Sequence, residues 1–375
     1  MQLGERAQLA QDTIQHKPVK GIPSWQLYIM QLDHAERFAG AQPGDYKKNP
    51  EQVYIAYQNK IGTCLLDQYI PDNALSMGDH GYVGGAHGAT TGASEIYCSG
   101  MLIDGPEAVA EHFERFVFPN LHEAIKNFDE IAAIDRIVSD HNNIQSRLGS
   151  NILKTGYGGI SFPHFNYGSY GYANYFMAYA LYPEVMEKHF SLQADLSLLR
   201  NKAAAKVFSR PDMPKLYRLD FDMADSRSTL VDIKSLDQIW FPQFARCLEP
   251  VLKTDLKMIW HCDGNLSEMV PRLLDVGIHG FQGFQYECNM DYEKICAMKT
   301  KDGDNLIIVG GVSVTTTLPM GTPADVKKEL EWLVKYGPKT GLLLGGSSSI
   351  TPGVPWDNMV TLVEGLKYYQ ERGRE

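Results

Sequence analysis

The sequence lacks the features that mark several classes of protein. No apolar run approaches the roughly 20 residues that a membrane-spanning helix needs. The six cysteines contain no pair with C-x-x-C spacing, so we expect reduced thiols rather than a disulfide framework. The N-terminal residues are polar and carry acid, which is not the pattern of a secretion signal. These absences favour a cytoplasmic protein.

Clustered positive charge is missing as well. The chain has 35 Lys+Arg against 45 Asp+Glu, a formal net charge of −10, and no basic cluster suited to nucleic-acid phosphates. Hydrophobic residues make up 44% and charged residues 21% of the chain, which excludes a disordered or coiled-coil protein. The 375 residues contain no low-complexity segment or linker, and they suffice for one large barrel or two ordinary domains.

The second half of the chain alternates apolar segments with amphipathic ones. The expected strands are residues 215–223, 256–261, 280–285, 306–312 and 341–346, and the expected helices are 235–253, 266–276, 291–299, 323–336 and 356–372. Thr322 is a suitable N-cap for the fourth of these helices. Strand and helix in regular alternation indicate a parallel sheet with right-handed crossovers.

The first half is less regular. Its strand candidates are residues 21–28, 62–69 and 157–162, and its expected helices are 106–127 and 172–200. Both halves together contain about eight strand–helix units, which favours a closed (β/α)8 TIM barrel over an open sheet. We expect the whole chain, residues 1–375, to form one α/β barrel domain with an N-terminal extension.

Polar side chains collect where the expected strands of the second half end. They include Asp220 and Asp222, the run from His261 to Asn265, Gln285, Glu287 and Cys288, Ser313, and the three serines at 347–349. A packed barrel interior does not require this collection, whereas (β/α)8 enzymes carry out their chemistry at these strand ends. The pattern therefore predicts an active site there.

Three segments of the second half resemble the uroporphyrinogen decarboxylase superfamily. Residues 259–266 (IWHCDGNL) are similar to its H-x-D-G-N strand end. Residues 309–323 contain its glycine-turn strand followed by LPMGTP, and residues 345–359 (GGSSSITPGVPWDNM) resemble its last-strand motif P-x-x-P-x-x-N. The resemblance covers roughly residues 200–375 and implies the (β/α)8 fold. The first 200 residues match only loosely.

The superfamily contains two chemistries, and the resemblance implies the second. Uroporphyrinogen decarboxylase itself binds a polycarboxylate tetrapyrrole through an arginine-rich N-terminal motif, which residues 16–26 (HKPVKGIPSWQ) do not contain. Corrinoid-dependent methyltransferases move a methyl group between a small donor and the cobalt of a separate corrinoid protein, often with bound zinc. No D-x-H-x-x-G cobalamin signature is present, so we expect the corrinoid on a partner protein. Cofactor-free decarboxylation is the alternative, and a non-catalytic barrel that docks a corrinoid protein is a third reading.

The chain departs from the thiol-methylating members of the methyltransferase branch. Those members bind zinc through His-x-Cys and a late Cys, whereas Asp263 and Ser348 stand at the two cysteine positions here. A soft thiolate site is therefore not reproduced. The departure indicates demethylation of an oxygen or nitrogen substrate, and the stretch from Ser347 to Trp356 resembles that of methyl-ether-cleaving O-demethylases. A methoxylated aromatic donor is expected.

The resemblance and the strand-end pattern suggest roles for particular side chains. We expect His261, Asp263 and Asp222 to be catalytic, because a metal ion or a positioned acid must activate the leaving oxygen. His261 and Glu287 are the expected metal ligands, with Cys288 or Asp222 completing a zinc site. The ordinary alternatives stay open: His261 as a hydrogen-bonded core histidine and Cys288 as a buried thiol.

Other residues are expected to contact the substrate. Ser347 and Ser348 offer hydroxyls at a strand end, and Tyr167 belongs to an aromatic segment, residues 162–176, that suits a flat ring. His80 lies in a Gly- and His-rich segment expected at the barrel mouth. Core packing is the alternative for the aromatic segment. The sequence leaves a homodimer open and names neither the donor nor the docking surface.

Overall fold

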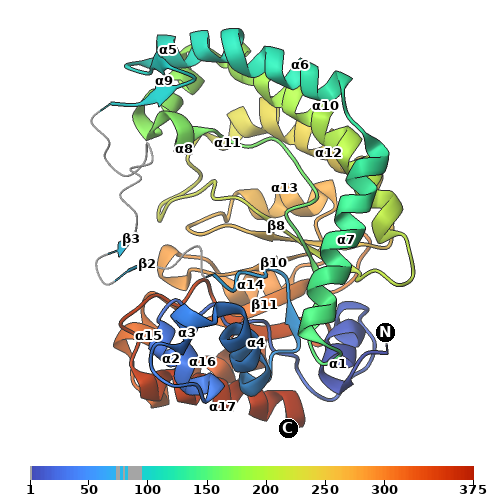
Figure 1. Ribbon diagram of the computed structural model, residues 1–375, viewed down its shortest axis with the longest axis vertical. Helices are drawn as coiled ribbons and strands as arrows, with labels where there is room; N and C mark the ends of the chain where they lie inside the picture. The colour runs from blue at the N-terminus through green and yellow to red at the C-terminus, as the bar shows by residue number, and fades with distance from the viewer. Residues whose placement is uncertain (1, 73–76, 79–80, 83–94) are drawn as a thin grey trace.

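The computed structural model describes residues 2–72, 77–78, 81–82 and 95–375. Its central feature is a sheet of six parallel strands (Figure 1). In spatial order these are β7 (Gly156–Tyr157), β8 (Leu216–Asp220), β9 (Lys257–His261), β10 (Gly280–Gln282), β11 (Ile307–Val312) and β12 (Leu342–Gly346). Spatial order equals chain order, as successive right-handed crossovers require.

Further backbone pairing carries the sheet around into a ring. Ser24 bridges to β12, and Trp25 bridges to β1 (Leu65–Leu66). β1 pairs in parallel with β6 (Leu153–Lys154), which continues along the chain into β7. With β6 and β7 counted as one segment, eight parallel segments follow one another around the barrel. This arrangement confirms the expected (β/α)8 fold.

The barrel interior is apolar at its base and polar toward its mouth. The base is a buried cluster of Trp25, Leu65, Leu153, Leu216, Ile259, Ile307, Val309 and Leu343 with Ala7, Ala10 and Ile14 of α1 (Glu5–Ile14). Helix α1 precedes the first barrel segment and is the expected N-terminal extension. Two positions beyond Leu65, Leu216 and Ile259, the residues are Asp67, Arg218 and His261. Because side chains alternate along a strand, these polar groups face the same interior.

The helices of the second half lie close to their expected places. They are α11 (Ile233–Ser235), α12 (Phe241–Leu252), α13 (Met269–Val276), α14 (Tyr292–Ala297), α15 (Thr317–Met320), α16 (Pro323–Tyr336) and α17 (Trp356–Arg372), with a π-helical turn between α11 and α12. Thr322 caps α16 as predicted: its hydroxyl accepts the Asp325 N–H at 3.3 Å, and the Asp325 carboxylate accepts the Thr322 N–H at 2.8 Å. This reciprocal pair fixes where α16 begins.

The first half adds helices at both ends of the molecule in Figure 1. They are α2 (Leu32–Ala39), α3 (Asp45–Lys48), α4 (Pro50–Ile61), α5 (Pro106–His112), α6 (Phe118–Lys126), α7 (Glu130–Leu148), α8 (Tyr167–Tyr170), α9 (Tyr172–Leu181) and α10 (Pro183–Phe208). Helices α5, α6, α10 and α12 gather at one end, and α2, α4, α16 and α17 at the other. Two short antiparallel pairs are also described: β2 (Met77–Gly78) with β3 (Gly81–Tyr82), and β4 (Tyr97–Cys98) with β5 (Met101–Leu102).

Two expected elements of the first half were wrong in their bounds. The helix expected over residues 172–200 is two helices, because Pro183 starts α10 and cannot continue the hydrogen bonding of α9 across Tyr182. The strand expected over residues 157–162 is wrong in its bounds, because β7 already ends at Tyr157, the first residue of the expected strand. Gly158 has φ +76°, a left-handed conformation that takes the chain out of the strand.

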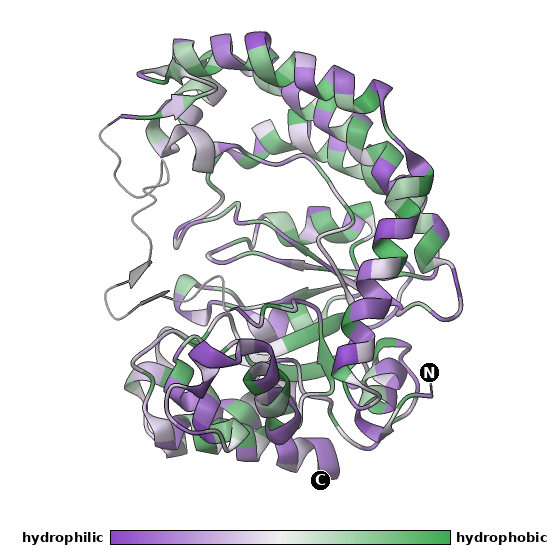
Figure 2. Cartoon of the chain, in the orientation of Figure 1, coloured by the Kyte–Doolittle hydropathy of each residue, from purple (hydrophilic) through white to green (hydrophobic). Residues whose placement is uncertain are grey.

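Hydropathy follows this architecture. The strands of the sheet are drawn largely in green, whereas the outer helices carry mixed green and purple faces (Figure 2). Such a division is typical of a sheet buried beneath amphipathic helices. Among the described residues, no helix combines the length and apolar character needed to cross a membrane.

Candidate active site

A cavity of about 390 Å³ opens at the carboxyl ends of the barrel strands. It is lined by Trp25, Gln26, Tyr28, Gln68, Tyr157, Arg218, Asp220, Asp222, His261, Asp263, Gln282, Gly346, Ser348 and Ser349. Its volume lies toward the small end of the range of about 300–1,000 Å³ for ligand sites. Reactions in (β/α)8 proteins take place at this end of the barrel.

Three side chains that could hold a metal ion converge in this cavity. Asp222 follows β8, His261 ends β9, and Asp263 lies two residues further on. One ligand atom from each lies within 4.8 Å of the other two. The His261 Nε2 atom is 3.8 Å from the Asp263 Oδ1 atom. The structure thus brings together the three residues that we expected to be catalytic.

The orientation of His261 is fixed by its other ring nitrogen. Nδ1 lies 3.0 Å from the carbonyl oxygen of Gln282, and because a carbonyl can only accept, Nδ1 carries the proton. In the neutral ring Nε2 is then the unprotonated nitrogen, and it is the one that faces Asp263. A histidine held in this way through its second nitrogen is the usual arrangement of a metal ligand.

Gly283 makes room for the imidazole ring. It has φ +75°, and a Cβ atom there would lie 2.7 Å from His261 Nδ1 and 2.6 Å from the Ser347 carbonyl oxygen. Any side chain at this position would therefore push the ring away and would also strain the backbone. Glycine is required here by the close approach of β9, β10 and the turn after β12.

The two carboxylates are linked through the backbone. The Asp263 N–H donates to Asp222 Oδ1 at 2.9 Å. Burial is the largest cause that raises the pKa of the Asp263 carboxyl, and the charges of Asp222 and Asp220 raise it further. His261 and the Ser348 hydroxyl oppose this increase. The site therefore carries closely spaced negative charge, which a bound cation would relieve.

Beside this triad lies a buried ion network that the sequence analysis missed. The Arg218 side chain is 5% exposed, its Nε atom donates to Asp67, and its Nη1 atom donates to Asp220 Oδ2 at 2.7 Å. Burial would lower the pKa of Arg218, but Asp67 and Asp220 raise it above its ordinary value. The guanidinium is thus permanently charged and already paired on two sides.

Tyr157 covers this network from β7. Arg218 lies 4.7 Å from the centre of its ring, and the Tyr157 hydroxyl donates to Asp220 Oδ2 at 3.1 Å. Burial, and next the Asp220 charge, raise the pKa of Tyr157 to about 12. The phenol therefore stays protonated at neutral pH and acts as a hydrogen-bond donor.

The residues expected to contact the substrate lie at different distances from the cavity. Ser348 lines it, and its hydroxyl lies 3.5 Å from Asp263 Oδ2. Ser347 is buried and its Oγ atom accepts the Val314 N–H at 3.1 Å, which is a structural contact. Tyr167 does not line the cavity, but its hydroxyl donates to the Asp222 carbonyl oxygen at 3.0 Å. His80 lies outside the described residues.

The other two expected metal ligands do not join the triad. The Glu287 carboxylate accepts a hydrogen bond from Thr315, and Cys288 Sγ lies 3.9 Å from Gln285 Oε1. Across the part of the chain that the structure describes, the metal-capable groups of three or more residues contain neither of them. Of the two residues that we expected to complete the zinc site, Cys288 or Asp222, it is Asp222 that lies beside His261.

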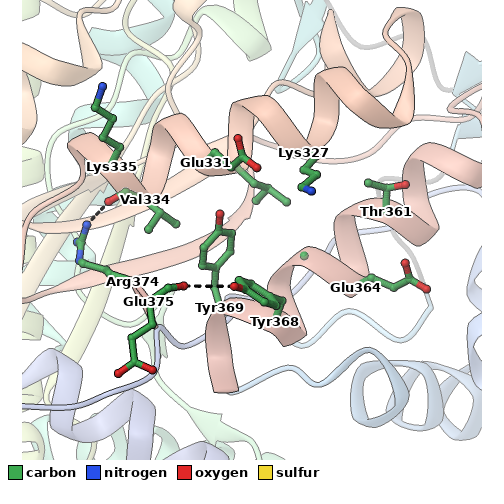
Figure 3. Close-up of a pocket in the computed structure, with 12 residues that line it drawn as sticks. Lys327, Glu331, Val334, Lys335, Thr361, Glu364, Tyr368, Tyr369, Arg374 and Glu375 are labelled. Carbon is green, nitrogen blue, oxygen red and sulfur yellow. Dashed lines mark hydrogen bonds between the residues drawn. The ribbon is translucent and has the colours of Figure 1, made fainter. Parts of the chain in front are cut away.

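A larger cavity of about 890 Å³ lies away from the strand ends, between α16 and α17 (Figure 3). Its walls carry charges of both signs, including Lys327, Glu331 and Glu364. Arg374 bonds the Val334 carbonyl oxygen, and the Tyr368 hydroxyl donates to the Glu375 carbonyl oxygen at 3.2 Å. None of its lining residues is a histidine or cysteine, and we assign it no catalytic role.

Comparison with known proteins agrees with the fold. The sequence model of the family described as Uroporphyrinogen decarboxylase (URO-D) matches residues 221–369, which include Asp222, His261 and Asp263. No curated protein matches the chain.

Two solved structures resemble this chain to different extents. A methyltransferase from Methanosarcina mazei is 16% identical, with a TM-score of 0.56 over 97% of this chain and 98% of its own. A presumed vitamin-B12-independent methionine synthase from Listeria monocytogenes is 15% identical, with a TM-score of 0.37 over 62% of this chain and 67% of its own. The first of these supports the barrel architecture along nearly the whole chain.

Proposed function

We propose that the chain is a corrinoid-dependent methyltransferase of the uroporphyrinogen decarboxylase superfamily, whose family model matches residues 221–369. It would transfer a methyl group from a small methylated donor, a methoxylated aromatic in the first instance, to the cob(I)alamin of a separate corrinoid protein. The observation that carries the proposal is the convergence of Asp222, His261 and Asp263 in a small cavity at the barrel mouth. The M. mazei methyltransferase of similar fold supports the same reading.

The donor set fits a divalent cation such as zinc. In its neutral form His261 offers the Nε2 atom of a ring held in place through Nδ1, and two carboxylates lie within 4.8 Å of it. Three protein ligands of this kind leave a coordination position open, as in catalytic zinc sites. A divalent cation bound there would act as a Lewis acid and stabilise the negative charge that develops on the leaving oxygen.

The chain's own groups would bind and orient the donor. Trp25 and Tyr157 line the cavity, and Tyr157 is exposed enough to offer part of its ring to an aromatic donor. Ser348, next to Asp263, offers a hydroxyl toward an ether oxygen. In the transfer, the C–O bond breaks and a cobalt–carbon bond forms with the electron pair of cobalt(I), while the oxygen keeps the C–O pair and later takes a proton.

A second aromatic layer stands behind Asp222. The ring of Tyr167 stacks on Tyr172 at 4.7 Å between centroids and lies 6.1 Å from Phe221. Its hydroxyl holds the Asp222 backbone at 3.0 Å. Tyr167 would therefore position a metal ligand rather than touch the donor.

The cavity does not suit decarboxylation of a polycarboxylate tetrapyrrole. Among its lining residues, Arg218 is the one lysine or arginine, and it is already paired with Asp67 and Asp220. Eight substrate carboxylates would meet three more acids there, which is electrostatically unfavourable. The decarboxylase alternative therefore has little support in this cavity.

The proposal is tested by elemental analysis together with two activity assays. The purified chain is expected to bind zinc in stoichiometric amount and to methylate cob(I)alamin from a panel of methoxylated aromatics. Release of carbon dioxide from uroporphyrinogen, without metal and without methyl transfer, would instead establish the decarboxylase chemistry. A chain that binds metal and a corrinoid protein but turns over no donor would be a docking barrel.

A further inference from the structure

Carboxylates outnumber basic side chains among the residues that line the cavity at the barrel mouth. Asp220, Asp222 and Asp263 line it, and Asp67 lies directly behind them against Arg218. Arg218 and the buried Lys154, which interacts electrostatically with Asp67, offset two of these four charges, and a divalent cation on the triad would offset the other two. No positive charge is then left over for a ligand, so a ligand carboxylate would enter this partly buried site without a cationic partner.

Arg218 cannot serve as a receptor for an anionic ligand. Its side chain is 5% exposed, two carboxylates already accept its hydrogen bonds, and the Tyr157 ring lies 4.7 Å from its guanidinium carbon. A ligand carboxylate would have to compete for the single positive charge of Arg218 with Asp67 and Asp220, which are both already paired with it. Repulsion from Asp220 would then outweigh what remains of the attraction.

An independent observation indicates that the missing ligand donates hydrogen bonds. Gln26 lines the same cavity and is 5% exposed. Its Oε1 atom is buried and accepts no hydrogen bond from the described residues. Leaving such an acceptor unsatisfied costs about 1–3 kcal/mol, so a ligand O–H or N–H at this wall would be favoured.

We propose that the site selects methyl donors that are neutral or cationic and carry a hydroxyl or amino group, and that it discriminates against donors with a carboxylate. This inference rests on the proposed function for the role of the ligand as methyl donor. It adds the chemical class of that donor. Asp220 supplies the charge selectivity, and Gln26 supplies the acceptor.

A matched series of ligands tests the proposal by binding rather than turnover. The zinc-loaded full chain is titrated in a calorimeter, without corrinoid protein, with 3-methoxybenzylamine, 3-methoxybenzyl alcohol and 3-methoxybenzoate. The amine and the alcohol are expected to bind at least about tenfold more tightly than the benzoate, which corresponds to 1.4 kcal/mol or more. Equal or tighter binding of the benzoate, or no binding of any of the three, would overturn the proposal.

Two variants assign the effect to the named residues. Asp220→Asn is expected to reduce the preference for the amine over the benzoate at least about threefold, whereas Asp302→Asn, the same change on an exposed loop, should leave it unaltered. Gln26→Met is expected to weaken the amine and the alcohol but not methoxybenzene. If Asp220→Asn does not fold, Gln68→Lys in the same cavity wall adds the opposite charge and should favour the benzoate. An unchanged preference in folded Asp220→Asn or Gln68→Lys contradicts the assignment to this cavity.

Failure of this inference is distinguishable from failure of the proposed function. Methyl transfer from all three probes with a preference for the benzoate would contradict the inference and leave the methyltransferase standing. The expected order of binding without methyl transfer to cob(I)alamin would uphold the charge selectivity and contradict the methyltransferase.

Discussion

The Nδ1 atom of His261 lies 3.0 Å from the backbone carbonyl oxygen of Gln282, one strand away in the barrel. The contact joins β9 to β10 and turns the Nε2 atom toward the two carboxylates of the candidate metal site. Since it uses a backbone acceptor, it is unaffected by the identity of the Gln282 side chain. What could disturb it is a change in the space that the ring occupies.

Gly283→Ala should weaken metal binding without removing a ligand. The new Cβ atom would lie 2.7 Å from His261 Nδ1, so the ring must shift and its Nε2 atom would no longer point toward the two carboxylates. Loss of such an orienting contact lowers metal affinity by about 10- to 100-fold. Competition against a zinc chelator measures the change. Gly303→Ala is the matched control, because Gly303 also has a positive φ of +88° but has open space around it; equal effects of the two variants would contradict this account.

His261→Ala should abolish stoichiometric metal binding and lower methyl transfer by at least about 100-fold, because it removes the one nitrogen ligand. Glu287→Ala provides the comparison, since its carboxylate bonds Thr315 outside the triad. Metal content after gel filtration separates the two. Loss of metal in the Glu287 variant and retention in the His261 variant would mean that the ligand set is different.

Asp67→Ala should destabilise the fold strongly. Asp67 is fully buried and accepts from Arg218, so its removal leaves a buried guanidinium with only Asp220 as a charged partner. Breaking a buried pair in this way costs about 3–5 kcal/mol. Urea unfolding measures the loss. Asp237→Ala, which breaks a more exposed pair with Arg272, should cost about 1 kcal/mol or less.

His189 should make the protein sensitive to acid. Burial, and next the nearby His164, lower the pKa of His189 from 6.5 to about 3. Below pH 6.5 His189 therefore binds a proton in the unfolded chain but not in the folded chain. The free energy of unfolding falls as the pH decreases toward 3. Between pH 7.5 and pH 5.0 the loss from this residue is about 2 kcal/mol.

The comparison between wild type and His189→Gln isolates this contribution. The free energy of unfolding of the variant should decline less between pH 7.5 and pH 5.0 than that of the wild type. Parallel pH profiles for the two proteins would show that His189 is not the group responsible.

The sequence allowed the second half of the barrel to be predicted almost element by element. Helix α16 has the expected bounds because a capping threonine, a proline and a regular apolar face all indicate the same start. Helix α7 (Glu130–Leu148) was missed although its sequence carries a signal. Its apolar residues Ile134, Ile137, Val138 and Ile144 recur at helical spacing and pack against the core, but only Leu148 is fully buried.

Some residues of the candidate site could likewise be predicted from local sequence, and others could not. His261 and Asp263 follow directly from one strand end, and local sequence was enough to find them. Arg218 and Asp67 were missed because a charged residue inside a strand is usually taken to face solvent. They are 151 positions apart, and only closure of the ring brings them together in the interior. Non-local pairing of this kind cannot be read from periodicity.

The most direct test of the central claim is a stoichiometric methyl-transfer measurement with the zinc-loaded chain, 2-methoxyphenol and cob(I)alamin, with the His261→Ala variant in parallel. The account predicts that methylcobalamin and demethylated phenol form in equal amounts with the wild type and at least about 100-fold more slowly with the variant. Equal rates for the two proteins, or no transfer by a wild type that holds its metal, would contradict it.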